Sequence, residues 1–170
     1  MAVTRQQIDE LYQRVEELTE RQEHQEALAL AVQARDLVRQ HLGAAHPAYA
    51  ESLNRLADVH FASGDHAGTE PLLREALDIR LRALGEDHPE SVQGMNDLAE
   101  LYFTRNRFAD AEPLLVRARD IVRRNLGENH PAYARSLNNL AVLYAAMNRE
   151  AEARALMEQS AAVEKRTAPN

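Results

Sequence analysis

The stretch Leu126-Gly127-Glu128-Asn129-His130-Pro131 decides the fold, because related stretches occur at residues 84–89 and 42–47. A constant 42 residues separate one copy from the next. Self-similarity at a fixed period of a few tens of residues is typical of stacked-repeat proteins. The glycine of each copy can take the left-handed conformation that ends a helix, and the proline suits the first position of the next helix. The sequence therefore predicts equal helical units joined by these loops.

The composition agrees with a helical protein. Apolar residues make up 45% of the 170 residues, whereas aromatic residues make up only 5%. A profile rich in Ala and Leu but poor in aromatic residues favours close-packed helices over a β-sandwich. The length is that of one domain with a full core. We therefore expect a single all-α domain over residues 1–170.

Several classes of function are disfavoured by composition. The chain contains no Cys, which excludes disulfides and thiolate zinc sites and fits a reducing compartment. The N-terminus has no apolar signal-peptide core, and no window approaches the roughly 20 apolar residues of a membrane span. The net charge of −7 disfavours nucleic-acid binding, which needs a basic patch. We expect a cytoplasmic protein with no membrane or nucleic-acid partner.

Each full unit contains two amphipathic segments, with apolar residues at the i, i+3, i+4, i+7 spacing of a helix. The first segments place on one face Leu53, Leu56, Ala57 and His60, then Met95, Leu98, Ala99 and Tyr102, then Leu137, Leu140, Ala141 and Tyr144. The second segments place on one face Thr69, Leu72, Leu73, Ala76 and Ile79, then Ala111, Leu114, Leu115, Ala118 and Ile121, then Ala153, Leu156, Met157, Ser160 and Val163. Between the two segments lie Gly64, Asn106 and Asn148, which tolerate positive φ. Asp65 is suited to cap the second helix of the first full unit.

The N-terminal part of the chain is a degenerate copy of the repeat. Apolar stripes run through residues 8–18 and 27–38, but the loop motif is incomplete. A coiled coil is disfavoured there because the first stripe lasts only about two heptads. The expected division is a degenerate repeat over 4–45, full repeats over 46–87, 88–129 and 130–166, and a frayed tail over 167–170. In total we expect eight helices and no sheet.

The run from Leu126 to Ala141, Leu-Gly-x-x-His-Pro-x-Tyr-Ala-x-Ser-Leu-Asn-x-Leu-Ala, resembles the 42-residue tetratricopeptide repeats of kinesin light chains and their bacterial relatives. The resemblance is strong from His46 to about Arg166 and weak from Thr4 to Gly43. It departs from the family pattern at His60, Thr69 and Ser160. The resemblance implies a right-handed α-solenoid whose first helices line a concave groove. Because the family is defined by architecture, it implies no particular partner.

A second stripe recurs on the first helix of each unit and is not required by the core. Asn repeats there at positions 54, 96 and 138, and an amide both donates and accepts, so a ladder of amides can hold a peptide backbone. The alternative is that these Asn side chains bond to neighbouring helices and stabilise the stack. The predicted groove residues are Glu51, Asn54, Asp58, Phe61, Gln93, Asn96, Glu100, Phe103, Arg135, Asn138 and Val142, with Tyr12 and Glu16 in the terminal unit.

We therefore predict an interaction scaffold that binds a peptide or partner helix in the concave groove. Acidic residues outnumber Arg135 along the stripe, which favours a neutral or basic partner segment. The acidic, tryptophan-containing peptides that kinesin light chains bind are not expected, because the basic lining is missing. The alternative function is self-assembly into a homo-oligomer through the terminal repeats.

Chemical sites are not indicated. His46, His88 and His130 lie a whole repeat apart, too far to share one metal ion, and are assigned to a loop or cap role beside the proline. The sequence has neither a glycine-rich phosphate loop nor a nucleophile elbow, so we expect no catalytic residue, cofactor or metal and no enzyme. Four arginines, at positions 117, 119, 123 and 124, cluster in one second helix. They suit a helix C-terminus, and a convex patch that binds an anion or a nucleic acid is the alternative.

Overall fold

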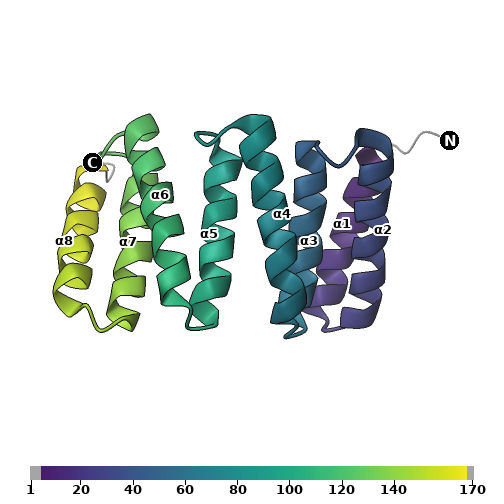
Figure 1. Cartoon of the computed structure of the whole chain (residues 1–170), viewed down its shortest axis with the longest axis horizontal. Coiled ribbons are helices and arrows are strands. Elements are labelled where there is room, and N and C mark those ends of the chain that lie inside the picture. The colour runs from purple at the N-terminus through teal and green to yellow at the C-terminus, as the bar shows by residue number, and fades with distance from the viewer. Residues whose placement is uncertain (1–4, 168–170) are drawn as a thin grey trace. The chain divides into compact units, whose positions relative to one another are not determined.

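Eight α-helices occupy residues 5–167, the part of the chain that the computed structural model describes, and no strand occurs among these residues (Figure 1). The all-α prediction is confirmed. The helices are α1 (Arg5–Glu20), α2 (His24–Leu42), α3 (Pro47–Ala62), α4 (His66–Leu84), α5 (Pro89–Thr104), α6 (Phe108–Leu126), α7 (Pro131–Ala146) and α8 (Glu150–Thr167). Of the predicted repeat ends, Thr4 and the tail residues 168–170 lie outside the described residues.

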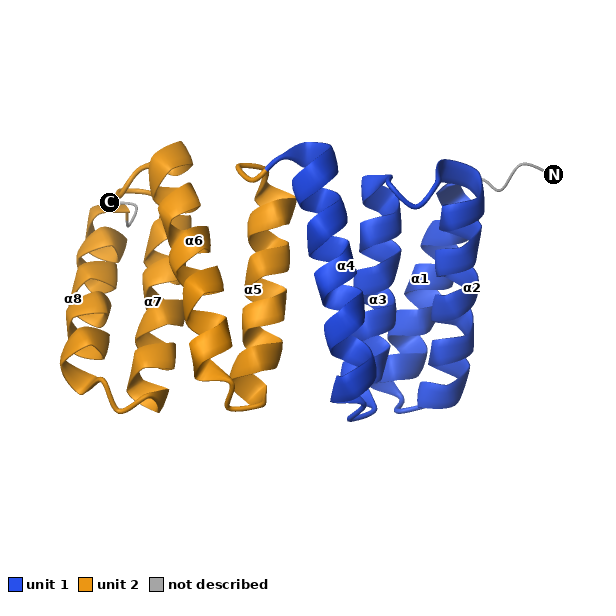
Figure 2. Ribbon diagram, viewed as in Figure 1, with its two compact units in different colours: residues 1–85 blue, residues 86–170 orange. Residues whose placement is uncertain are grey.

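The chain divides into two compact units, residues 1–85 and 86–170 (Figure 2). Unit 1 contains α1–α4 and unit 2 contains α5–α8. Within unit 1, α2 packs against α1 and α3, and α3 packs against α4. Within unit 2, α6 packs against α5 and α7, and α7 packs against α8. Each unit is therefore a pair of helical hairpins with its own core.

Histidine caps the first helix of each full repeat. The Nδ1 atoms of His46, His88 and His130 accept hydrogen bonds of 3.1, 3.2 and 3.1 Å from backbone amides two residues later. A side-chain acceptor at this position satisfies one of the amides that a helix start leaves unpaired. The following proline has no amide to satisfy. The predicted cap role of these histidines is confirmed.

The loop glycines differ in part from the expected conformation. Gly43, Gly85 and Gly127 have φ of 87°, 86° and 83°, so the predicted positive φ is confirmed. Their ψ values of 159°, 166° and 166° are extended, and the predicted left-handed helical conformation is wrong. This combination of φ and ψ is accessible essentially only to glycine. It turns the chain outward from one helix toward the histidine cap of the next.

Short turns with one positive-φ residue join the two helices of a hairpin. Gly64, Asn106 and Asn148 have φ of 81°, 56° and 58°, as predicted, and Gln22 has φ of 62° at the equivalent point of the degenerate repeat. Asp65 then caps α4, accepting a hydrogen bond of 3.0 Å from the Gly68 amide. One turn type therefore serves all four hairpins.

Each core is built from the predicted stripes. In unit 1, Leu53 of α3 belongs to one buried cluster with Val38 of α2 and Ile79 of α4. In unit 2, Leu137 of α7 packs with Val163 of α8. Every predicted inner-face residue of the three full repeats is buried or half-buried except Met157.

The prediction for Met157 is wrong. Its side chain is 50% exposed, whereas its equivalents Leu73 and Leu115 are 7% and 8% exposed. Met157 lies on α8, which packs against α7, whereas α6, the helix of Leu115, packs against both α5 and α7. The inner-face stripe recurs in every repeat, but the burial of its side chains depends on which helices pack against them.

Candidate functional site

A cleft of about 600 Å³ lies within unit 2, lined by α5, α6 and α7. Five of the predicted groove residues line it, and these are Gln93, Asn96, Glu100, Arg135 and Asn138. They come from two first helices, α5 and α7, which run in the same direction (Figure 1). The repeat spacing therefore brings these side chains to one surface, which we call the α5–α7 cleft.

Both apolar and amide-bearing side chains line the α5–α7 cleft. Its apolar lining consists of Pro89, Val92, Ala118, Ile121, Val122, Leu126 and Ala132. Its amides are those of Gln93, Asn96, Asn125, Asn138 and Asn139. Ligand sites are typically apolar with a few placed polar groups, and their volumes are roughly 300–1,000 Å³. The cleft has this character.

Two of the amides are already engaged. The Gln93 side chain donates a hydrogen bond of 2.7 Å to the Asp97 carboxylate, and the Asn125 side chain donates one of 3.0 Å to the backbone carbonyl of Asp87. In contrast, the side-chain amides of Asn96 and Asn138 make no hydrogen bond to any other described residue. Asn96 is half-buried and Asn138 is exposed. Both amides are available to a ligand.

The aromatic residues of the predicted groove lie outside the cleft lining. The ring of Phe103 packs against Phe108, with centroids 5.5 Å apart, and Phe61 packs against His66 at 5.1 Å. Both contacts are made within a single hairpin, beside its turn. Val142 is 50% exposed on α7 without lining the cleft. The remaining predicted residues lie on α3 of unit 1, where Asn54 is half-buried and Glu51 and Asp58 are exposed.

Tyr12 holds in unit 1 the repeat position that Asn96 holds in unit 2. Its side chain is only 9% exposed, so its expected place in an open groove is wrong. The Arg55 guanidinium of α3 lies 5.6 Å from the centroid of the Tyr12 ring. Burial raises the pKa of Tyr12 to about 12, and the nearby Glu51 carboxylate adds to the rise. The aromatic ring thus packs against α3, whereas the smaller Asn96 leaves open space beside α7.

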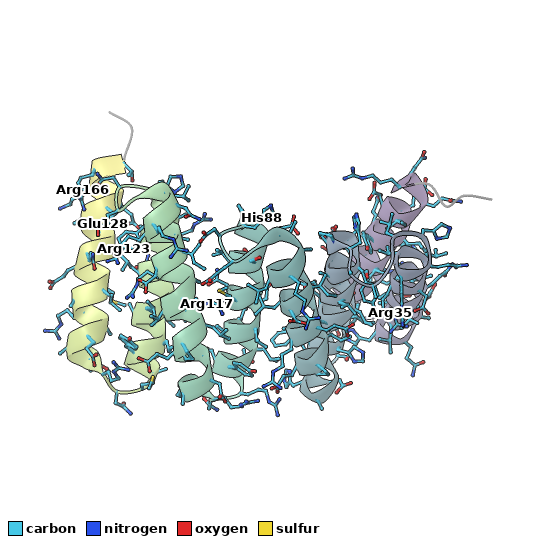
Figure 3. All side chains as sticks on the ribbon, turned by 45° about the horizontal axis from the view of Figure 1, so that its top comes forward. Arg35, His88, Arg117, Arg123, Glu128 and Arg166 are labelled. Carbon is cyan, nitrogen blue, oxygen red and sulfur yellow. The ribbon has the colours of Figure 1, made fainter. Side chains whose placement is uncertain are left out.

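Beside the cleft, α6 is joined to the loop before α5 by contacts that the sequence did not reveal. Arg124 near the end of α6 pairs with Asp87 in the loop before α5, and Arg117 bonds to Glu86 at 2.7 Å. The hydrogen bond from Arg117 lowers the pKa of Glu86. These contacts join α6 to the loop that contains His88; Figure 3 labels His88 and, on α6, Arg117.

The same pairs weigh against an anion-binding patch on α6. Of the four clustered arginines, Arg117 and Arg124 bond to the loop before α5, and Arg119 pairs with Asp120 at 2.7 Å. Arg123 is exposed. Three guanidinium groups are thus neutralised within unit 2.

Asn125 and Asn139 line the cleft but were not among the predicted residues. Asn139 follows the predicted Asn138 directly, and Asn125 precedes the repeated Leu-Gly motif. No periodic pattern marks either one, because their repeat equivalents are not Asn. Only the packing of three helices brings them to one surface.

No group of three or more His, Asp or Glu side chains able to hold a metal ion occurs within residues 5–167. None of the described helices is long and apolar enough to cross a membrane.

Comparisons with known proteins agree with the repeat architecture. The family model of the tetratricopeptide repeat matches residues 11–80, 52–121 and 91–165. The TPR-like repeats of a kinesin light chain from Podosopora anserina are 25% identical in sequence, with a TM-score of 0.83 over 96% of this chain and 77% of that chain. No curated protein sequence matches the chain significantly.

Two further structures are similar in fold alone. BtubC (BKLC) from P. vanneervenii is 21% identical, with a TM-score of 0.83 over 94% of this chain and 63% of that chain. A Rap protein complexed with competence and sporulation factor is 14% identical, with a TM-score of 0.62 over 96% of this chain and 54% of that chain. On the matched residues and the repeated hairpins, the chain belongs to the tetratricopeptide repeat family.

Proposed function

We propose that this protein is an interaction module, without catalytic activity of its own, that binds a peptide or a partner helix in the α5–α7 cleft. Tetratricopeptide repeats generally mediate protein–protein interactions. The observation that carries the proposal is the pair of amides on Asn96 and Asn138, which have no partner among the described residues and stand at an apolar cleft.

The chemistry of the cleft suits a polypeptide. An Asn amide offers two donors and an acceptor, so it can pair with both the N–H and the C=O of a backbone. Asn is a poor helix former, and keeping it in two helices costs stability that a binding role explains. The apolar lining around Val92 and Ile121 would receive an apolar side chain of the bound segment. Together these features support recognition of backbone and side chain in one site.

The other predicted residues extend this proposal. Phe103 and Val142 lie further along α5 and α7 and would contact a segment longer than the cleft. On α3 of unit 1, Glu51, Asn54, Asp58 and Phe61 form a second candidate contact surface. Each surface is testable by itself.

The experiment fills the cleft with a tyrosine side chain, because Tyr12 occupies the equivalent position in unit 1. A random dodecapeptide phage library is panned on the wild-type protein, and the enriched peptides are synthesised with a fluorescent label for anisotropy. The variant Asn96→Tyr copies the residue found at Tyr12 and should weaken binding at least about tenfold while the helical circular dichroism is retained. Ala155→Tyr, at an exposed position of α8, is the matched control and should bind normally.

Two outcomes would overturn the proposal. The first is that no peptide is enriched over several rounds of panning. The second is that the enriched peptides bind Asn96→Tyr as tightly as wild type, since the cleft would then have no part in binding. A further variant, Asn138→Leu, removes an amide while keeping a side chain of similar size. It should also weaken binding, which would show that the amide contributes apart from the open space.

Self-assembly is the second candidate function, and the exposed Met157 on α8 favours it. Exposed charges surround this side chain, however, and these are Arg154, Glu158, Glu164 and Lys165. Burying them against another copy would cost desolvation energy. Sedimentation equilibrium over a range of concentrations tests this alternative: a single monomer mass at all concentrations would exclude it, and a mass that falls in Met157→Glu would support it.

A further inference from the structure

Some of the charged side chains that line the α5–α7 cleft have partners within unit 2, and others have none among the described residues. The Asp87 carboxylate pairs with Arg124, and the Asp97 carboxylate accepts the hydrogen bond from Gln93. The Nδ1 atom of His130 accepts from the Ala132 amide as a helix cap. Among the fully charged side chains of the lining, Arg135 and Glu100 remain, both exposed and without an ion pair to any described residue. The cleft therefore presents one available cation and one available anion.

These two charges lie at different levels along the cleft. Arg135 on α7 has the same repeat position as Gln93 on α5, because 42 residues separate them. Glu100 lies seven residues beyond Gln93 on α5, which corresponds to about 10 Å along the helix axis. Asn96 and Asn138 occupy equivalent repeat positions, and along the helix axis these lie between the level of Arg135 and the level of Glu100. An extended peptide advances about 3.3 Å per residue, so this axial offset alone corresponds to about three peptide residues, and the step from α7 to α5 adds to it.

We propose that the cleft binds a peptide segment that carries an acidic and a basic residue at least about three positions apart, with the acidic side chain at Arg135 and the basic side chain at Glu100. The inference rests on the function proposed above and adds the chemistry and direction of the ligand. Backbone amides can pair with Asn96 and Asn138 in either chain direction, so the amides alone leave the direction open. The opposite charges at the two ends make one direction favourable and the other repulsive.

This charge pattern changes the expectation for the partner. Counting all the acidic residues of the stripe favoured a neutral or basic segment. Of those stripe residues only Glu100 lines the cleft, and the two other carboxylates there, those of Asp87 and Asp97, are already bonded within unit 2. The charge available to a ligand is consequently bipolar, and the segment that fits is neutral overall with separated charges.

The test compares the wild type with the single variant Arg135→Glu, which leaves two available carboxylates at the cleft. Dodecapeptides enriched on the wild type should share an acidic and a basic residue at least about three positions apart, in either order, because a segment with the reversed order can bind in the opposite direction. A synthetic pair is then made in which the acidic residue is either kept or replaced by Lys. The wild type should prefer the peptide with the acidic residue by about tenfold, and Arg135→Glu should prefer the Lys peptide by a similar factor. Raising the ionic strength should reduce both preferences, because these charges are exposed.

The matched control reverses a charge outside the cleft, in Arg154→Glu on the exposed face of α8. This variant should keep the wild-type preference. The inference is overturned if the enriched peptides share no pair of opposite charges. It is equally overturned if Arg135→Glu prefers the same peptide as the wild type.

Failure of this inference can be told apart from failure of the proposed function. Peptides that lose binding to Asn96→Tyr but bind the wild type equally well with the acidic residue or with Lys in its place would support the cleft and reject its charge pattern. Peptides that bind Asn96→Tyr normally, or a library from which nothing is enriched, would reject both.

Discussion

The guanidinium carbon of Arg149 lies 3.8 Å from the centroid of the Tyr144 ring, and the same guanidinium bonds to Glu112 at 2.8 Å. It also bonds to Glu152 one turn later. Arg149 thereby joins the start of α8 to the end of α7 and to α6. The equivalent pair in the second full repeat is Arg107 over Tyr102, at 4.4 Å. In the first full repeat the pair becomes His60 and Asp65, hydrogen-bonded at 2.8 Å, so the contact at this turn is kept while its chemistry changes.

Removing the Arg149 side chain should loosen the last hairpin. Arg149→Ala deletes the stacking on Tyr144 and the bonds to Glu112 and Glu152, and we expect the midpoint of thermal unfolding to fall by about 2–4 °C. Arg149→Lys keeps the charge but lacks the planar fork, so it should restore only part of the loss. Arg154→Ala, on the same helix and exposed, is the control. Equal effects at positions 149 and 154 would contradict the linking role.

The histidine cap of α5 should be replaceable by a better cap. His88→Ala removes the acceptor for the Glu90 amide, and we expect a loss of about 1 kcal/mol in the free energy of unfolding. His88→Asn supplies an oxygen acceptor at the same position and should match or exceed the wild type. Urea denaturation followed by circular dichroism measures both. If His88→Asn is as unstable as His88→Ala, the side chain of His88 is stabilising α5 by some other contact.

Leu98 of α5 is 4% exposed and should carry a large share of the stability of unit 2. We expect Leu98→Ala to lower the free energy of unfolding by about 2–5 kcal/mol, because truncation loses apolar burial and leaves a cavity. Val142→Ala, at a side chain that is 50% exposed, should change it by less than about 0.5 kcal/mol. A repeat protein transmits such damage to its neighbours, so hydrogen exchange should quicken in α6 and α7 as well. A cost at Leu98 no greater than that at Val142 would refute this account.

Burial of Tyr12 should make unit 1 sensitive to alkali. Its folded pKa of about 12 lies above the value of about 10 expected for an unfolded chain, so folding favours the protonated phenol. This contribution is complete below about pH 10 and is lost as the pH rises toward 12. Tyr12→Phe cannot ionise and should flatten the decline of stability over that interval. Denaturation midpoints measured across it in both proteins provide the test, and parallel declines would count against the buried phenol as the cause.

The candidate site was predictable only in part. The repeat spacing identified Asn96 and Asn138 as sharing a face, because equal positions in stacked hairpins point the same way. It could not identify Asn125, Asn139 or the bonded state of Asp87. The bond between Arg124 and Asp87 joins residues 37 apart in the chain. Such pairs depend on the positions of two helices and a loop together.

Local structure followed from the sequence alone. The 42-residue period placed the helices, His-Pro placed their starts, and Gly or Asn placed their turns, because each of these signals acts through the backbone of a few adjacent residues. Exposure was decided by tertiary structure. Tyr12 is buried and its equivalent Asn96 lines a cleft, while Met157 is exposed and its equivalent Leu115 is covered. The reason is physical: a side chain is removed from water by neighbouring helices, and the presence, size and spacing of those neighbours are not encoded at the position itself.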